Sequence, residues 1–111
     1  MRRCYINASG RRLWPRAGAP TGADPGLESS VTVLPARLPN LQMEGLYSHF
    51  ATADSESTAF AGMQQRRFGR LLAQLAKEGV AVPVVHPANS GGVLNLPGSY
   101  HRMVRPGLIL Y

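Results

Sequence analysis

The 111-residue sequence has one cysteine, three histidines and few acidic residues. Cys4 has no partner for an internal disulfide, and a free thiol is typical of a reducing compartment such as the cytoplasm. No apolar run approaches the roughly 18 residues of a membrane span. His49, His86 and His101 stand apart and give no zinc-ligand pattern. We therefore expect a single cytoplasmic domain with no metal site and no membrane segment.

The sequence also lacks the usual signatures of covalent catalysis. Its one lysine, Lys77, falls at the exposed end of a predicted helix, whereas a catalytic lysine needs an apolar, partly buried place that lowers its pKa. No G-x-S-x-G elbow places a serine nucleophile before a helix. We expect neither Lys77 nor a serine to act as a nucleophile.

Positive charge is the unusual term in the composition, with 12 Lys+Arg against 6 Asp+Glu and a net charge of +6. Much of the excess positive charge lies near the N-terminus. Prolines and glycines recur there and interrupt any helical or alternating pattern of apolar residues. Residues 1–30 are therefore expected to be unstructured. A basic arm neutralises phosphates, so one hypothesis is a small nucleic-acid-binding protein that uses this arm. The arginines concerned are Arg2, Arg3, Arg11, Arg12 and Arg16.

The most regular part of the sequence predicts one amphipathic helix from about residue 54 to 78. One face at helical spacing carries four apolar residues, Phe68, Leu71, Leu72 and Leu75. Asp54 or Ser55 is suited to the N-cap. Lys77 falls in the last turn, where the helix dipole favours a positive charge. A glycine follows at position 79, just past the helix, where a residue in the left-handed conformation is common.

Short apolar runs on either side of this helix predict strands. We expect strands at residues 31–34, 45–50 and 80–85, then a helical turn at 93–97 and a last strand region at 103–104 and 108–111. Strands that alternate with a helix indicate an α/β fold with a parallel sheet. The carboxyl edge of such a sheet carries ligands. Polar turns fall at three strand ends, namely at Ser48-His49, at Asn89-Ser90 and at Arg105-Pro-Gly107.

Four linked segments then give a specific resemblance. They are Gly45-Leu-Tyr-Ser-His-Phe-Ala-Thr-Ala-Asp54, Gln65-Arg-Arg-Phe68, His86-Pro-Ala-Asn-Ser-Gly91 and Met103-Val-Arg-Pro-Gly-Leu-Ile-Leu-Tyr111. In order and spacing they resemble alanine racemase, from about Leu34 to Tyr111. The resemblance implies a (β/α)8 barrel of the TIM type that binds pyridoxal 5'-phosphate. The chain would be roughly its last three strands.

The same resemblance implies an isomerase of D-alanine biosynthesis. Such an enzyme interconverts L- and D-alanine for peptidoglycan precursors, works as a homodimer and has a C-terminal β-domain after the barrel. The Ser-His-Phe-Ala-Thr-Ala-Asp and Met-Val-Arg-Pro-Gly runs favour the racemase over a related decarboxylase or a non-catalytic cofactor-binding protein. Under this resemblance no nucleic-acid partner is expected. The expected substrate is alanine.

The resemblance assigns cofactor contacts to six residues. Asn89 and Ser90 match the segment whose serine hydroxyl holds the cofactor phosphate. Gly107 and Leu108 match backbone N–H donors to that phosphate, and phosphate sites near the last two strands are common in such barrels. Arg105 matches the arginine that faces the pyridine nitrogen. His49 matches a histidine beside the cofactor that hydrogen-bonds to the arginine.

The departures from the family pattern limit these expectations. The cofactor-carrying lysine on the first barrel strand and the tyrosine base of the C-terminal domain have no counterparts, so no catalytic residue is retained. The family's Asp-Thr-Gly-Met segment is not recognisable in residues 29–37. We therefore divide the chain into a disordered or non-homologous segment, 1–33, and a partial barrel, 34–111. A truncated or frame-shifted fragment, inactive by itself and marginally stable, is the expectation.

Overall fold

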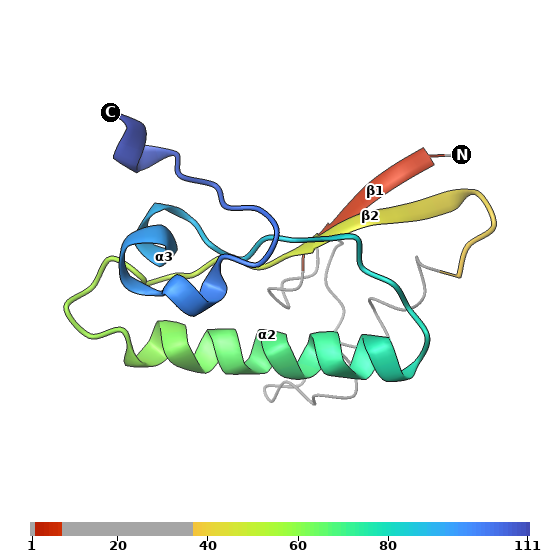
Figure 1. Cartoon of the computed structure of the whole chain (residues 1–111), viewed down its shortest axis with the longest axis horizontal. Helices are drawn as coiled ribbons and strands as arrows, with labels where there is room; N and C mark the ends of the chain where they lie inside the picture. Colours follow the sequence, from red (N-terminus) through yellow and green to blue (C-terminus); the bar gives the residue numbers. More distant parts are fainter. Residues whose placement is uncertain (1, 8–36) are drawn as a thin grey trace, which may run out of the picture.

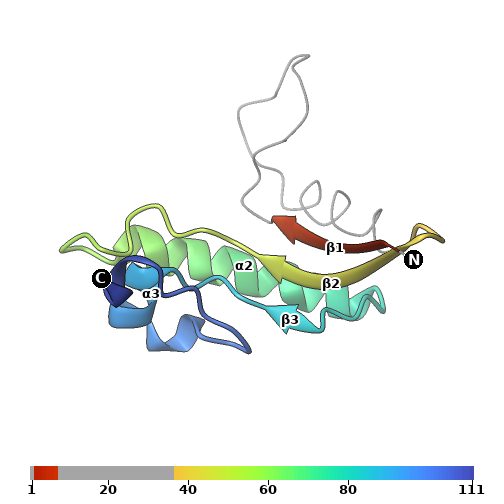
Figure 2. The same cartoon turned by 90° about the horizontal axis from the view of Figure 1, so that it is seen from above.

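The computed structural model describes residues 2–7 and 37–111, and its centre is a three-stranded parallel sheet. The strands are β1 (Arg2–Asn7), β2 (Leu41–Tyr47) and β3 (Val84–Val85), in the order β1-β2-β3. Helix α2 (Ala59–Lys77) connects β2 to β3 and lies along one face of the sheet (Figures 1 and 2). The expected α/β fold with parallel strands is confirmed.

The sheet continues beyond β3 as a looser fourth segment. The Arg102 N–H donates to the Val85 carbonyl at 3.3 Å, and the Arg105 N–H donates to the Ala88 carbonyl at 2.9 Å. A parallel bridge joins Asn89 to Arg105. The three polar turns predicted from the sequence therefore follow neighbouring parallel segments, and they meet at one edge of the sheet.

The core forms where α2 packs on β2. Leu46 and Leu75 are fully buried there, and Phe68 and Leu71 are nearly so. The predicted apolar face of the helix is confirmed, because Phe68, Leu71 and Leu75 lie in this cluster and Leu72, the fourth residue of the face, packs against it partly buried. Burying one such side chain contributes about 1.5–3 kcal/mol.

The end of α2 matches its prediction and its start does not. Gly79 has φ of +74°, its N–H donates to Ala76, and the Val80 N–H donates to Leu75, which together make a Schellman motif. The helix begins at Ala59 instead of near residue 54. The residues before the helix form a loop that contains a turn, in which the Ser55 N–H donates to the Thr52 carbonyl. Ala53 is buried within this loop. The proposed caps at residues 54 and 55 are therefore wrong.

The C-terminal part differs most from expectation. A short helix, α3 (Ser90–Asn95), begins directly at the polar turn, and two 3-10 turns follow, η1 (Pro97–Ser99) and η2 (Leu108–Leu110). The last strand region is reduced to the bridge at Arg105, because the proline after it has no N–H for a ladder.

The N-terminal prediction is wrong in one part and lies outside the structure in the rest. Residues Arg2–Asn7 were expected to be unstructured but form β1 beside β2. The remainder of the expected unstructured segment and the strand at 31–34 lie outside the described residues. In the described part of the chain, no helix has both the length and the apolar character needed to cross a membrane.

Candidate functional site

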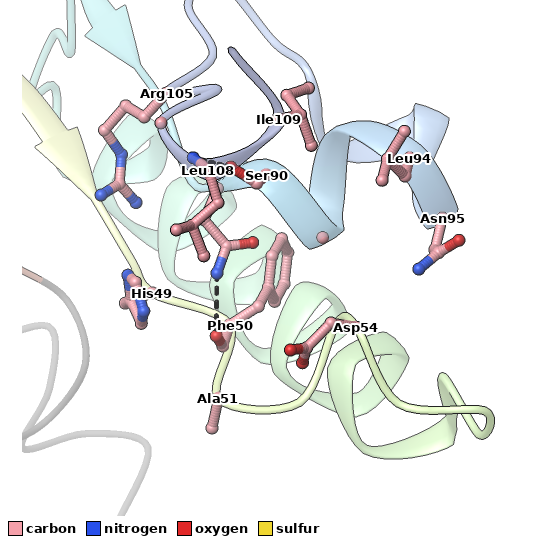
Figure 3. A pocket seen from close by; sticks show the side chains of 13 residues that line it. His49, Phe50, Ala51, Asp54, Ser90, Leu94, Asn95, Arg105, Leu108 and Ile109 are labelled. Carbon is pink, nitrogen blue, oxygen red and sulfur yellow. Dashed lines mark hydrogen bonds between the residues drawn. The ribbon is translucent and has the colours of Figure 1, made fainter. Parts of the chain in front are cut away.

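A pocket of about 570 Å³ opens at the carboxyl ends of the parallel segments (Figure 3). Its walls come from the loop after β2, the first turns of α3 and the chain from Arg105 to η2. All six residues picked from the sequence line this one pocket. They are His49, Asn89, Ser90, Arg105, Gly107 and Leu108.

Asn89 starts α3 and ties it to the neighbouring loop. Its side-chain oxygen accepts from the Gly92 N–H at 3.0 Å, as an N-cap does, which explains why the helix begins at Ser90. Its Nδ2 donates to the Phe50 carbonyl at 3.1 Å. Both polar ends of this side chain are therefore used within the chain, and Asn89 shapes the pocket wall.

Ser90 and Leu108 face each other across the pocket wall. The Leu108 N–H donates to the Ser90 hydroxyl at 2.8 Å, so the hydroxyl keeps its own proton for another acceptor. The Gly107 N–H donates to the Arg105 carbonyl at 2.9 Å and closes a tight turn. An anion at this place would find the Ser90 hydroxyl already positioned, whereas the Gly107 and Leu108 N–H groups would exchange an internal partner for it.

Arg105 is held by two backbone carbonyls and one ring. Its terminal nitrogen donates to the Ser48 carbonyl at 2.7 Å and to the Pro87 carbonyl at 3.3 Å. Its guanidinium carbon lies 5.4 Å from the centre of the Tyr47 ring, within the range of a cation–π contact. The Arg105 Nε is buried and has no hydrogen-bond partner among the described residues. A fixed cation with one buried donor therefore lines the pocket.

Two further residues, which had not been assigned to the site from the sequence, lie near this guanidinium: Tyr47 contacts it, and His86 stacks on Tyr47. The Tyr47 and His86 rings stack, with centres 5.3 Å apart and planes 14° from parallel. Burial lowers the pKa of His86 below 6.5, and the nearby Arg105 charge lowers it further. His86 is thus held neutral near pH 7. Its position just before the Asn-Ser turn was a signal that could have found it.

His49 lines the pocket but is an exposed residue. The hydrogen bonds of Arg105 go to backbone carbonyls, at Ser48 and Pro87. The bond from His49 to the arginine therefore stays a prediction.

Close packing between α3 and the loop after β2 fixes the floor of the pocket. A Cβ added at Gly91 would stand 2.8 Å from backbone atoms of Ala53 and Asp54, which only glycine allows without a shift. This packing brings Asp54 and Asn95 into the pocket lining. Neither residue was predicted from the sequence, because no local pattern indicates that α3 packs on this loop.

The sequence of the chain matches a known protein family. Its residues 21–111 match the family described as "Alanine racemase, N-terminal domain". The chain belongs to the alanine racemase family. The match begins at residue 21, so it includes part of the segment, 1–33, that the sequence analysis had set apart as disordered or non-homologous.

Individual racemases agree with this assignment. The chain is 41% identical over 75 residues to the alanine racemase of Carboxydothermus hydrogenoformans, a match that covers 68% of this chain and 20% of that protein. It resembles the crystal structure of alanine racemase from Streptomyces lavendulae at 32% identity, with a TM-score of 0.71 over 98% of this chain and 27% of the other.

A third relative, the Bacillus anthracis racemase solved with bound L-Ala-P, gives 28% identity and a TM-score of 0.73 over 98% of this chain and 26% of that one. The parallel segments are therefore part of an alanine racemase barrel, as expected. The chain spans about a fifth of the length of the curated alanine racemases it matches.

Proposed function

We propose that this chain provides the cofactor-anchoring wall of an alanine racemase, with pyridoxal 5'-phosphate as cofactor and alanine as substrate. The observation that supports the proposal most is convergence. Residues separated by as much as 59 positions, from His49 to Leu108 (108 − 49), line one pocket. They are the six residues to which the racemase pattern assigns cofactor contacts.

The pocket fits a phosphorylated pyridine in size and in donors. Its volume, about 570 Å³, lies within the range of roughly 300–1,000 Å³ that small-molecule sites occupy. The Ser90 hydroxyl has a proton to donate to a phosphate oxygen, and the Leu108 N–H is already within 2.8 Å of that hydroxyl. The buried Arg105 Nε needs an acceptor, which an unprotonated pyridine nitrogen supplies.

Arg105 then sets the electronic state of the cofactor ring. Pyridoxal phosphate supplies an electron sink for the carbanion that racemisation requires. A guanidinium does not release its proton at ordinary pH, so Arg105 leaves the ring nitrogen largely unprotonated. Such a ring draws electrons weakly, which favours reversible proton exchange over side reactions. The Tyr47 ring and the Ser48 and Pro87 carbonyls keep the guanidinium in place.

The acid–base groups of racemisation are proposed to come from outside these 111 residues. Lys77 is exposed at the far end of α2 and does not line the pocket. The proposed enzyme is a homodimer, as in the family. For the 111-residue chain by itself we expect exchange between L- and D-alanine at the background rate.

Binding of pyridoxine 5'-phosphate, measured by calorimetry, tests the proposal. This probe has the ring and the phosphate but no aldehyde, so it does not react with Lys77. Ser90→Ala should weaken its binding by roughly 10- to 100-fold, the value of one hydrogen bond to a charged group. The same change should leave binding of unphosphorylated pyridoxine unaltered.

Ser57→Ala is the matched control, since Ser57 is exposed and lies outside the pocket. Equal affinity of the original chain and the Ser90→Ala variant for pyridoxine phosphate would refute the phosphate assignment. Absence of binding by the original chain would refute the proposed function as a whole.

A further inference from the structure

The backbone of the loop after β2 is held by side chains from the elements around it. The Ser48 carbonyl accepts from Arg105 at 2.7 Å, and the Phe50 carbonyl accepts from Asn89 at 3.1 Å. Further along, the Ala53 carbonyl accepts from Asn95 at 2.7 Å. Each of these donors also lines the pocket. The loop is therefore placed by specific polar contacts and not by apolar packing alone.

A further residue that holds this loop comes from outside the pocket. Gln64 lies in the second turn of α2 and does not line the pocket, yet its carboxamide makes two bonds to the loop. Its Nε2 donates to the His49 carbonyl at 3.3 Å, and its Oε1 accepts from the Ala51 N–H at 3.2 Å. A single planar group thus binds the backbone on both sides of Phe50.

The two Gln64 bonds fix the orientation of the peptide groups on either side of Phe50, which the packing of the Phe50 ring does not determine. The Phe50 side chain is buried, 2% exposed, and it contacts the α3 backbone at Gly92, so the position of this residue is set. Packing of one ring does not determine how the peptide planes beside it are turned. A donor and an acceptor on the same carboxamide do determine it, because both bonds require particular directions. The Ser48 carbonyl, which accepts from Arg105, immediately precedes the His49 carbonyl, which accepts from Gln64.

We propose that Gln64 is a positioning residue of the cofactor site, acting through the backbone of residues 48–51. It orients the His49 and Ala51 peptide groups, which keeps the Ser48 carbonyl aimed at the Arg105 guanidinium. The guanidinium belongs to a residue that lines the pocket, and its Nε is buried with no hydrogen-bond partner among the described residues. The consequence for cofactor binding rests on the proposed function, whereas the effect on the loop does not depend on it.

Amide hydrogen exchange at Ala51, measured by NMR on the 111-residue chain without any ligand, tests the contact itself. Gln64→Leu removes the acceptor, so the Ala51 amide should exchange about tenfold faster. Gln64→Glu keeps an acceptor oxygen and should restore the protection. Gln65→Leu changes the adjacent helix residue, whose amide lies beside Gly98, and should leave the exchange rate unchanged because the bonds to the loop are made by Gln64. An Ala51 rate that is equal in the original chain and in Gln64→Leu would overturn the proposal.

Calorimetry with pyridoxine 5'-phosphate tests the consequence. Gln64→Leu should weaken binding roughly tenfold, the value of about one net hydrogen bond. Gln65→Leu should bind as the original chain does. If Gln64→Leu loses Ala51 protection yet binds the probe normally, the positioning role is refuted. If the original chain does not bind the probe, the proposed function fails, and the exchange data still decide whether Gln64 orients the loop.

Discussion

Replacement of Arg105 by glutamine probes the contact on which the cofactor side of the site depends. The guanidinium donates to two carbonyls and lies over the Tyr47 ring. A hydrogen bond from a charged donor is worth about 1.5–3 kcal/mol, and a cation–π contact at a partly exposed site adds about 0.5–1 kcal/mol. Relief of the desolvation of the charge offsets part of this loss. We expect Arg105→Gln to lower the free energy of unfolding by about 2 kcal/mol in urea denaturation.

The same variant has a second readout in the titration of His86. The Arg105 charge is the smaller of the two causes that lower the pKa of His86, and burial is the larger. In Arg105→Gln the pKa of His86 should therefore rise but stay below 6.5, as followed by NMR of the ring protons. Arg102→Gln is the control, because Arg102 is exposed. A change in unfolding free energy under about 0.5 kcal/mol, together with an unmoved His86 pKa, would contradict the described geometry.

Other substitutions test the packing and the pH dependence. Gly91→Ala forces a Cβ to within 2.8 Å of the loop backbone and should cost about 1–3 kcal/mol in urea denaturation, whereas Gly69→Ala, on an open face of α2, should stabilise by up to about 1 kcal/mol. Leu75→Ala empties a fully buried site and should cost about 2–5 kcal/mol. Since folding lowers the pKa of His86, the unfolded chain binds its proton more readily. Stability measured across pH should be full above about 6.5 and should fall below it, a slope that His86→Gln should reduce.

The helix and the strands β2 and β3 were predictable because their signals are local, whereas β1 was not predicted. Four apolar residues at helical spacing indicated the buried face of α2, and a glycine indicated its end. The start of the helix was not predictable in the same way. Asp54 and Ser55 are good caps by type, but Ala53 is buried against Phe50 and Ala61, and that packing holds the chain in a loop for several residues more. Tertiary contact overrode the local preference.

Residues of the candidate site likewise differ in whether their role could be predicted from local sequence. Its six predicted residues sit in linear motifs, and the parallel topology alone brings strand ends from distant parts of the sequence together. The residues that were missed had been given no role, although Tyr47 and His86 lie within two of the quoted segments. Tyr47 and His86 matter through a ring stack beside Arg105, and Asn95 through a bond to a carbonyl 42 residues earlier. Those contacts join segments far apart in the sequence, so the local pattern around each residue does not reveal them.

The arrangement separates two tasks within one pocket wall. The side-chain bonds described for residues 48–53 run mostly to backbone groups, so the loop keeps its shape while the side chains it carries remain available. His49 illustrates this division, because its carbonyl is bound by Gln64 while its imidazole is exposed at the pocket. A site built in this way resists changes of side chain at the surface of the pocket better than changes in the residues that hold its backbone. Losses at Gln64 and Gly91, which present no functional group to a ligand, should therefore rival the loss of a direct contact.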